Sequence, residues 1–233
     1  MSRKSITVCM VLFAVAASAM PSTASASPVL THPTGTTLAT GSTLVGAGIG
    51  TSYFKDGSGS VLAQCSIAKF KGSLVSIFPP EWTITTWTLE GTGSVWNGMH
   101  ECTGSSFGFG NVTYTTNGGG VDGENVTNGT PYCLRMTGLV SFSQRGGACS
   151  QAARKITIIL DSTNFGECKY ERSTAITGTG TSDTSGSSVL TWAPNETTRF
   201  TRAEGGSVLC PSTGSLEMSY RLETENGEPI YIS

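Results

Sequence analysis

Charge and reactive side chains are scarce in this sequence. Charged residues are 13% of its 233 residues, and His32 and His100 are its two histidines. Any Ser-His-Asp triad would need one of them, and the His-Glu-x-x-His motif does not occur. Without a convincing helix, no Gly-x-Ser-x-Gly nucleophile elbow between a strand and a helix is expected. The sequence therefore argues against common serine hydrolases and zinc proteases, and it predicts no cofactor.

Long hydrophobic runs are lacking after the first 26 residues. Ile6 to Ala19 is an apolar stretch of 14 residues that follows the basic Arg3 and Lys4, and it is too short to span a bilayer. Residues 24–26, Ala-Ser-Ala, have the small-x-small form of a signal-peptide cleavage site. We therefore predict a signal peptide over 1–26, a secreted protein, and no transmembrane segment in the mature chain.

Basic clusters are absent from the predicted mature chain, residues 27–233. Without Arg3 and Lys4, 12 basic residues stand against 16 acidic ones, a net charge of −4. Nucleic acids and anionic lipid surfaces need concentrated Lys and Arg, so neither is an expected partner. The length suits one β-sandwich or barrel. We expect a flexible N-terminal segment over 27–45 and an all-β domain over 46–233.

Six cysteines remain when Cys9 leaves with the signal peptide. An even number of cysteines in an exported chain predicts disulfides. Neighbouring strands of an antiparallel fold tend to be neighbours in sequence, so among the possible pairings we favour the sequential one: Cys65–Cys102, Cys133–Cys149 and Cys168–Cys210. The closest two cysteines have 15 residues between them, unlike zinc ligands, and no metal is predicted.

Apolar residues alternate with polar ones, as in strands that bury one face. In residues 216–223, Leu216, Met218, Tyr220 and Leu222 alternate with polar and charged side chains. Asn-Gly and Asp-Gly pairs between such runs favour tight hairpin turns; they are Asp56-Gly57, Asn97-Gly98, Asn117-Gly118, Asp122-Gly123, Asn128-Gly129 and Asn226-Gly227. The pattern predicts an all-β, single-domain antiparallel sandwich or barrel with three disulfides.

Two segments resemble each other. Residues 102–118 and 210–227 both begin with a cysteine and end with Asn-Gly, and 106–118 align with 215–227 at a shift of 109. Another echo, Gly91-Thr-Gly93 against Gly178-Thr-Gly180, has a shift of 87. Because the two shifts disagree, we favour one structural pattern used twice, a disulfide-anchored strand that ends in a tight turn. Internal duplication is the alternative.

Three tryptophans, Trp82, Trp87 and Trp96, lie within 15 residues of one another. Exposed on a sheet, such rings could stack on sugars, whereas buried rings belong to the core. Trp82 and Trp87 are an odd number of residues apart, so on one regular strand they would point to opposite faces. Trp87 and Trp96 are the candidate ligand-binding residues of a shallow groove, with core burial as the commoner alternative.

Carboxylates offer two further candidates. Glu167 and Glu171 share one face of a predicted strand with Lys169 between them, which suits a solvated ion-pairing face better than the facing acid pair of a glycosidase. The segments Asp56-x-Ser58-x-Ser60 and Asp122-x-Glu124 carry oxygen ligands for calcium, but both contain Asp-Gly and are explained by turns.

Several cysteine-centred strings carry a family resemblance. They are HPTGT (32–36), GGACS (146–150), GECKYERS (166–173) and LCPSTGSLEMSYRLET (209–224). With them the chain resembles uncharacterised secreted proteins of actinobacteria over most of its mature length. The resemblance implies bacterial origin and export, and it brings no activity or assigned functional residue.

The function expected from these observations is a non-enzymatic extracytoplasmic binding or envelope-associated module. A cell-envelope glycan or another surface protein is the candidate partner. Two alternatives remain open, a secreted hydrolase with a carboxylate pair from distant strands and a carrier of a small apolar ligand. A facing carboxylate pair would favour the first, and a large apolar cavity would favour the second.

Overall fold

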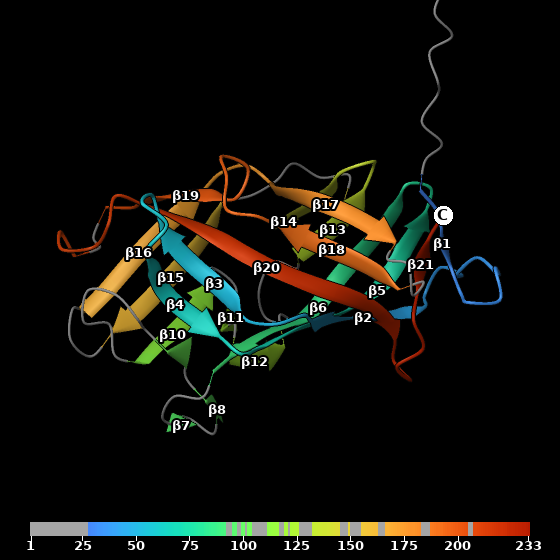
Figure 1. Cartoon of the computed structure of the whole chain (residues 1–233), viewed down its shortest axis with the longest axis horizontal. Coiled ribbons are helices and arrows are strands. Elements are labelled where there is room, and N and C mark those ends of the chain that lie inside the picture. Colours follow the sequence, from blue (N-terminus) through green and yellow to red (C-terminus); the bar gives the residue numbers. More distant parts are fainter. Residues whose placement is uncertain are drawn as a thin grey trace, which may run out of the picture.

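A computed structural model describes residues 28–91, 95–96, 99–100, 102–103, 111–116, 119–120, 122–125, 132–144, 149, 155–162, 166–182, 187–204 and 207–233. All regular structure in these residues is β-strand (Figure 1). None of these residues belongs to a helix of the length and apolarity that crossing a membrane requires.

Eight strands form a closed antiparallel ring, which we call the first ring. Each strand pairs with the next one named, and the last pairs with the first. In this order they are β2 (Thr43–Gly48), β5 (Ile67–Ile77), β6 (Pro80–Glu90), β13 (Tyr132–Met136), β14 (Val140–Gln144), β17 (Ile176–Ser182), β18 (Ser188–Trp192) and β20 (Thr213–Thr224). The predicted all-β fold is confirmed, and it is a barrel.

A second ring continues from the first along the same long strand. Its order is β3 (Ser52–Asp56), β4 (Val61–Cys65), β9 (Cys102–Thr103), β10 (Asn111–Thr116), β15 (Ile156–Ser162), β16 (Gly166–Arg172), β19 (Arg199–Arg202) and again β20. The first half of β20 pairs in the second ring and its second half in the first, so the red strand of Figure 1 runs through both.

The two rings are interleaved along the chain. After β2 the chain contributes β3 and β4 to the second ring, β5 and β6 to the first, and so on until β20 serves both. Each ring is therefore an up-and-down meander in sequence order, and neither is a contiguous piece of sequence. We call the region between the rings, where the chain crosses from one to the other, the waist.

Six short strands complete the described structure. They are β1 (Leu30–Thr31), β7 (Val95–Trp96), β8 (Met99–His100), β11 (Gly119–Gly120), β12 (Asp122–Asn125) and β21 (Tyr231–Ile232). β1 pairs with β21, and Leu30, Leu38 and Ile230 are buried in the core beside them. Residues 28–45, within the segment expected to be flexible, thus contain β1, the start of β2 and three buried leucines, Leu30, Leu38 and Leu44.

Aromatic side chains fill the interior of the first ring. Trp87 lies against Tyr132 and Phe142 with ring centroids 5.7 Å and 5.0 Å apart, and its indole N–H donates a 2.9 Å hydrogen bond to the Tyr220 hydroxyl. Tyr220 also packs on Phe70 at 5.0 Å. These contacts place the ring's largest side chains at its centre.

A bulge in β6 explains why Trp82 and Trp87 are both buried. Lys71 pairs with Thr86 and Gly72 pairs with Ile84, so Thr85 is an extra residue in the ladder. One extra residue reverses the side-chain phase of a strand. The expectation that the two tryptophans point to opposite faces is therefore wrong: they are 1% and 3% exposed in one core.

The second ring has a smaller aromatic core. Phe54 lies between Tyr170 and Phe200, with centroids 5.0 Å and 6.1 Å away. Burial raises the pKa of Tyr170 to about 12, while the charge of Arg202 lowers it and that of Asp56 raises it. The buried Tyr170 hydroxyl has no hydrogen-bond partner among the described residues.

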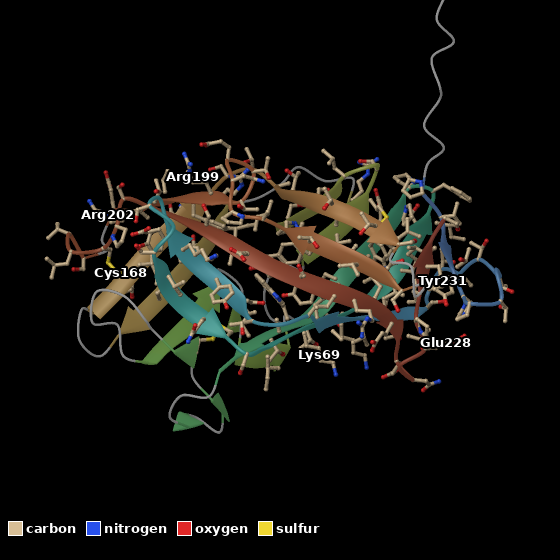
Figure 2. The ribbon with its side chains drawn as sticks, in the orientation of Figure 1. Lys69, Cys168, Arg199, Arg202, Glu228 and Tyr231 are labelled. Atoms are coloured by element: carbon tan, nitrogen blue, oxygen red, sulfur yellow. A yellow bond between two sulfur atoms is a disulfide. The ribbon has the colours of Figure 1, made fainter. Side chains whose placement is uncertain are left out.

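Three disulfides join the pairs predicted from sequence order. They are Cys65–Cys102, Cys133–Cys149 and Cys168–Cys210, with Cα atoms 4.7, 5.4 and 5.7 Å apart. The first ties β4 to β9, where the second ring has a single registered pair, Gln64 with Thr103. The third ties β16 to the loop before β20 (Figure 2).

Three hairpins share one hydrogen-bond pattern. Across residues 32–36, 56–60 and 224–228, the first residue's N–H donates to the fifth residue's carbonyl and the fourth residue's N–H donates to the first residue's carbonyl. The fourth residue is Gly35, Gly59 or Gly227, with φ of 83°, 88° and 79°. This pattern fits a three-residue loop with a left-handed glycine. The Asp-Gly pair at 122–123 instead lies inside strand β12, so its prediction as a turn is wrong.

Gly227→Ala is expected to lower the free energy of unfolding by about 1 kcal/mol, because a Cβ is disfavoured at positive φ. Asn226→Ala in the same turn is the control and should change it by less than about 0.5 kcal/mol. Urea unfolding of both variants measures the difference. Equal effects would contradict a special role for the glycine.

Two tyrosine-to-phenylalanine changes should differ. Tyr220→Phe leaves the buried Trp87 N–H without its acceptor and should lower the free energy of unfolding by about 1–3 kcal/mol. Tyr170→Phe removes a buried hydroxyl that lacks a described partner, and we expect a change within about 0.5 kcal/mol of zero. Thermal and urea unfolding compare them; a more harmful Tyr170→Phe would refute the assignment.

Candidate functional site

The two predicted ligand-binding tryptophans do not form an exposed groove together. Trp87 is 3% exposed, and its indole N–H donates a hydrogen bond to the Tyr220 hydroxyl inside the first ring. Its prediction as a surface ligand-binding residue is therefore corrected to a core residue. Trp96 belongs to β7, which pairs with β8, and its side chain lies outside the described part of the structure. A ligand-binding role for Trp96 remains a prediction.

An open cleft lies instead on the outside of the waist. In the first ring the ladder between β2 and β5 ends at the pair Ala47 with Lys69. In the second ring the ladder between β3 and β4 resumes at Ser52 with Cys65. Between these two pairs, residues 48–51 do not pair with residues 66–68. The crossing of the chain from ring to ring thus splits the wall of the molecule.

Small side chains make this split hollow. The cleft has a volume of about 340 Å³ and is lined by Val45, Ala47, Gly48, Ser66, Ile67, Ala68, Lys69 and Glu223. Gly48 allows a close approach of the two strands, because a Cβ there would lie 2.6 Å from the Ala68 carbonyl oxygen. We call this site the waist cleft; Lys69 is labelled in Figure 2 below the middle of β20.

The register of three strands sets the chemistry of the cleft. On the outer face, Ala47 of β2 pairs with Lys69 of β5 on one side and with Arg221 of β20 on the other. Two residues along, Val45 pairs with Lys71 and Glu223 in the same way. A strand of small apolar residues therefore runs between two strands that carry charges.

We call the outer face of β2, formed by Val45 and Ala47, the outer strip, and an ion pair covers one end of it. The Lys71 ammonium lies against the Glu225 carboxylate from the opposite side of β2, and Val45 between them is 8% exposed. The hydrogen bond from Lys71 and its charge hold the pKa of Glu225 below its usual value, against a small opposing effect of burial. The waist end of the strip, around Ala47 and Gly48, remains open.

The predicted carboxylate candidates have structural roles. The hydrogen bond from Lys155, 2.8 Å away, lowers the pKa of Glu171; burial opposes this, and the charges of Lys155 and Lys169 add to it. Glu167 lies on the same strand and is exposed. These contacts match the solvated ion-pairing face that the sequence favours.

Asp56 organises a turn in the described structure. Its Oδ1 accepts hydrogen bonds from the Ser58 N–H, the Ser58 hydroxyl and the Ser60 N–H, at 2.9, 2.7 and 2.8 Å. Burial by itself would raise the pKa of Asp56, but these bonds and one from Gly59 outweigh it and hold the pKa below 3.8. Within the described residues, no group of three His, Cys, Asp or Glu side chains could hold a metal ion.

Other sequence candidates lie apart from the cleft. The His32 ring lies 3.4 Å from Glu228, beside the β1–β21 pair. The side chains of His100, Asp122 and Glu124 lie outside the described residues. So does GSSFG, residues 104–108, which has the form Gly-x-Ser-x-Gly. The waist cleft itself was missed, because its walls come from strands far apart in sequence.

Asp56→Ala should lower the free energy of unfolding by about 1 kcal/mol at pH 7, because three hydrogen bonds are lost. The folded pKa lies below the ordinary 3.8, so the carboxylate contributes stability above about pH 4 and loses it as the pH falls through the folded pKa. Urea unfolding between pH 7 and pH 2 measures this. Asp56→Asn, which keeps an acceptor, is the control; an unchanged gap between wild type and Asp56→Ala at pH 2 would contradict the expectation.

Comparison of the chain with protein-family models, with curated proteins and with solved structures found no match.

Proposed function

We propose that this protein is a secreted, non-enzymatic binding module of the bacterial cell envelope, and that its ligand binds in the waist cleft. The observation that carries the proposal is the cleft itself. It is open to solvent, and its lining combines small residues with one positive charge, Lys69, and one negative charge, Glu223. Such a site can hold a polar ligand without any movement of the barrel.

The packing of the interior favours an outer site. In the first ring, Tyr132 and Phe142 stack at 4.8 Å, and Phe142 contacts Trp192 at 6.4 Å. A carrier of an apolar ligand would have to displace these side chains, at a cost of several kcal/mol for each large side chain removed from a packed core. The carrier alternative is therefore less favoured than binding in the cleft.

Electrostatics favour binding over acid catalysis. A glycosidase acid needs a carboxyl group whose pKa is raised. The described carboxyl groups with a shifted pKa, Asp56, Glu171 and Glu225, are all shifted downward. They suit fixed negative charges in turns and ion pairs, so the hydrolase remains the second candidate.

Export supports an envelope role. Three disulfides form and persist in oxidising surroundings outside the cytoplasm. The predicted signal peptide over 1–26 and the resemblance to secreted actinobacterial proteins point the same way. A cell-envelope glycan or a protein of the cell surface is the partner class that fits this location.

Ser66→Trp tests the site. Ser66 is exposed at the rim of the cleft, so a tryptophan there would fill the cleft without disturbing the core. We expect at least tenfold weaker binding to purified actinobacterial cell envelopes, measured by cosedimentation, and weaker binding on a glycan array. Thr137→Trp, in the exposed β13–β14 turn, is the matched control and should bind as wild type does.

Two results would overturn this function. One is no binding of the wild-type protein to envelopes or glycans. The other is equal binding by Ser66→Trp and Thr137→Trp, which would place the ligand elsewhere. Trp96→Ala in the same assay decides whether the β7–β8 segment contributes.

A further inference from the structure

Two basic side chains differ from all others that the structure describes. Ten Lys and Arg side chains are described, and eight of them make ion pairs or bond to backbone carbonyls. Lys69 and Arg221 make neither kind of contact with another described residue. Both are exposed. In an acidic protein, cations without an internal anion are free to serve a ligand.

Lys69 lines the cleft, and Arg221 lies beside it, on the other side of Ala47. Lys69 and Arg221 are the two cross-strand partners of Ala47, one on β5 and one on β20. They are thus two strand spacings apart, about 10 Å between backbones. Both side chains are long enough to close over the small Ala47 from either side. An anionic group above Ala47 would be within reach of both.

A single negative charge stands in the next row. Glu223 is the partner of Val45 on β20, lines the cleft, and makes no ion pair with another described residue. It is two residues along the strand from Arg221, about 6.7 Å away. The neighbouring Glu225 is already paired with Lys71. Lys69 and Glu223 in the cleft and Arg221 beside it therefore provide two positive charges and a separate negative charge in neighbouring rows of the sheet.

We propose that the waist cleft binds the end of a short peptide that carries both a carboxylate and an ammonium group. The carboxylate lies between Lys69 and Arg221, and the ammonium lies at Glu223. Two residues of extended peptide span up to about 7 Å, which matches the spacing of the two rows. The inference rests on the proposed binding function and specifies its ligand.

Other ligand classes fit this arrangement less well. A neutral sugar would leave all three charges without a partner. A phosphate or sulfate would meet the two cations but also the repulsion of Glu223. A ligand with both signs satisfies all three side chains, and its ammonium removes the repulsion.

Three probes test the ligand class by titration of isotope-labelled full-length mature protein, followed by NMR. They are alanyl-alanine, its N-acetyl derivative without the ammonium, and its C-terminal amide without the carboxylate. We expect shifts at the cleft residues, with alanyl-alanine binding about two- to fivefold more tightly than the N-acetyl form. The amide should bind about tenfold more weakly than alanyl-alanine, because it loses two charge contacts.

Charge-removing variants test the residues. Lys69→Gln and Arg221→Gln should each weaken alanyl-alanine binding about two- to fivefold, and should equalise binding of the acid and the amide when combined. Glu223→Gln should remove the preference for alanyl-alanine over its N-acetyl form. Lys55→Gln is the control, because Lys55 is paired with Glu217 on the second ring; it should leave binding unchanged. All four positions lie on outer faces, and circular dichroism checks folding.

The inference is wrong if alanyl-alanine gives no shift at the cleft, if the amide binds as well as the acid, or if the Lys69 and Arg221 variants bind as wild type does. A neutral glycan that binds in the cleft with no dependence on these charges would also overturn it. In each case the proposed function still stands if Ser66→Trp abolishes binding to envelopes. If alanyl-alanine does not bind at the cleft and Ser66→Trp also binds envelopes as wild type does, both proposals are wrong.

Discussion

Closure of both rings through β20 is the constraint on which the rest of the structure depends. This strand of 12 residues is about 40 Å long. It pairs with β19 and β3 in its first half and with β18 and β2 in its second half. Its alternation buries Leu216, Met218, Tyr220 and Leu222. One strand thus supplies side chains to the interior of both rings, which form one continuous core, and closes both sheets.

The interleaved order of the strands makes the two rings interdependent. Because each ring takes alternate pairs of strands from the chain, neither has a contiguous stretch of sequence from which to fold by itself. Two of the three disulfides, Cys65–Cys102 and Cys168–Cys210, support the second ring, where the contact between β4 and β9 is short, and Cys133–Cys149 holds β13 of the first ring. The first ring has the larger group of packed aromatic side chains, in which each ring contacts at least one other; they are Trp87, Tyr132, Phe142, Trp192 and Tyr220. Two disulfides thus stabilise the second ring, whereas aromatic packing contributes more to the first ring.

The waist cleft follows from this architecture. Where the chain passes between rings, the β2–β5 ladder ends before the β3–β4 ladder begins. Glycine and other small residues fill the gap incompletely, and the outer faces of β5 and β20 bring charges to its edges. The proposed binding site therefore lies on the outside of the molecule, at the point where its wall is interrupted. The filled interiors serve stability.

Sequence alone determined the strand class and the outward placement of the Glu167–Lys169–Glu171 row, because alternation and charge are local signals. It only favoured the sequential pairing of the six cysteines, which the tertiary structure then confirmed. It did not determine the inward position of Trp87, since a single bulge at Thr85 reverses side-chain phase and leaves no mark in the residue pattern. It also could not place Lys69, Ala47 and Arg221 in one row. Those residues are separated by long stretches of chain, and only the closure of the sheet through β20 brings them together.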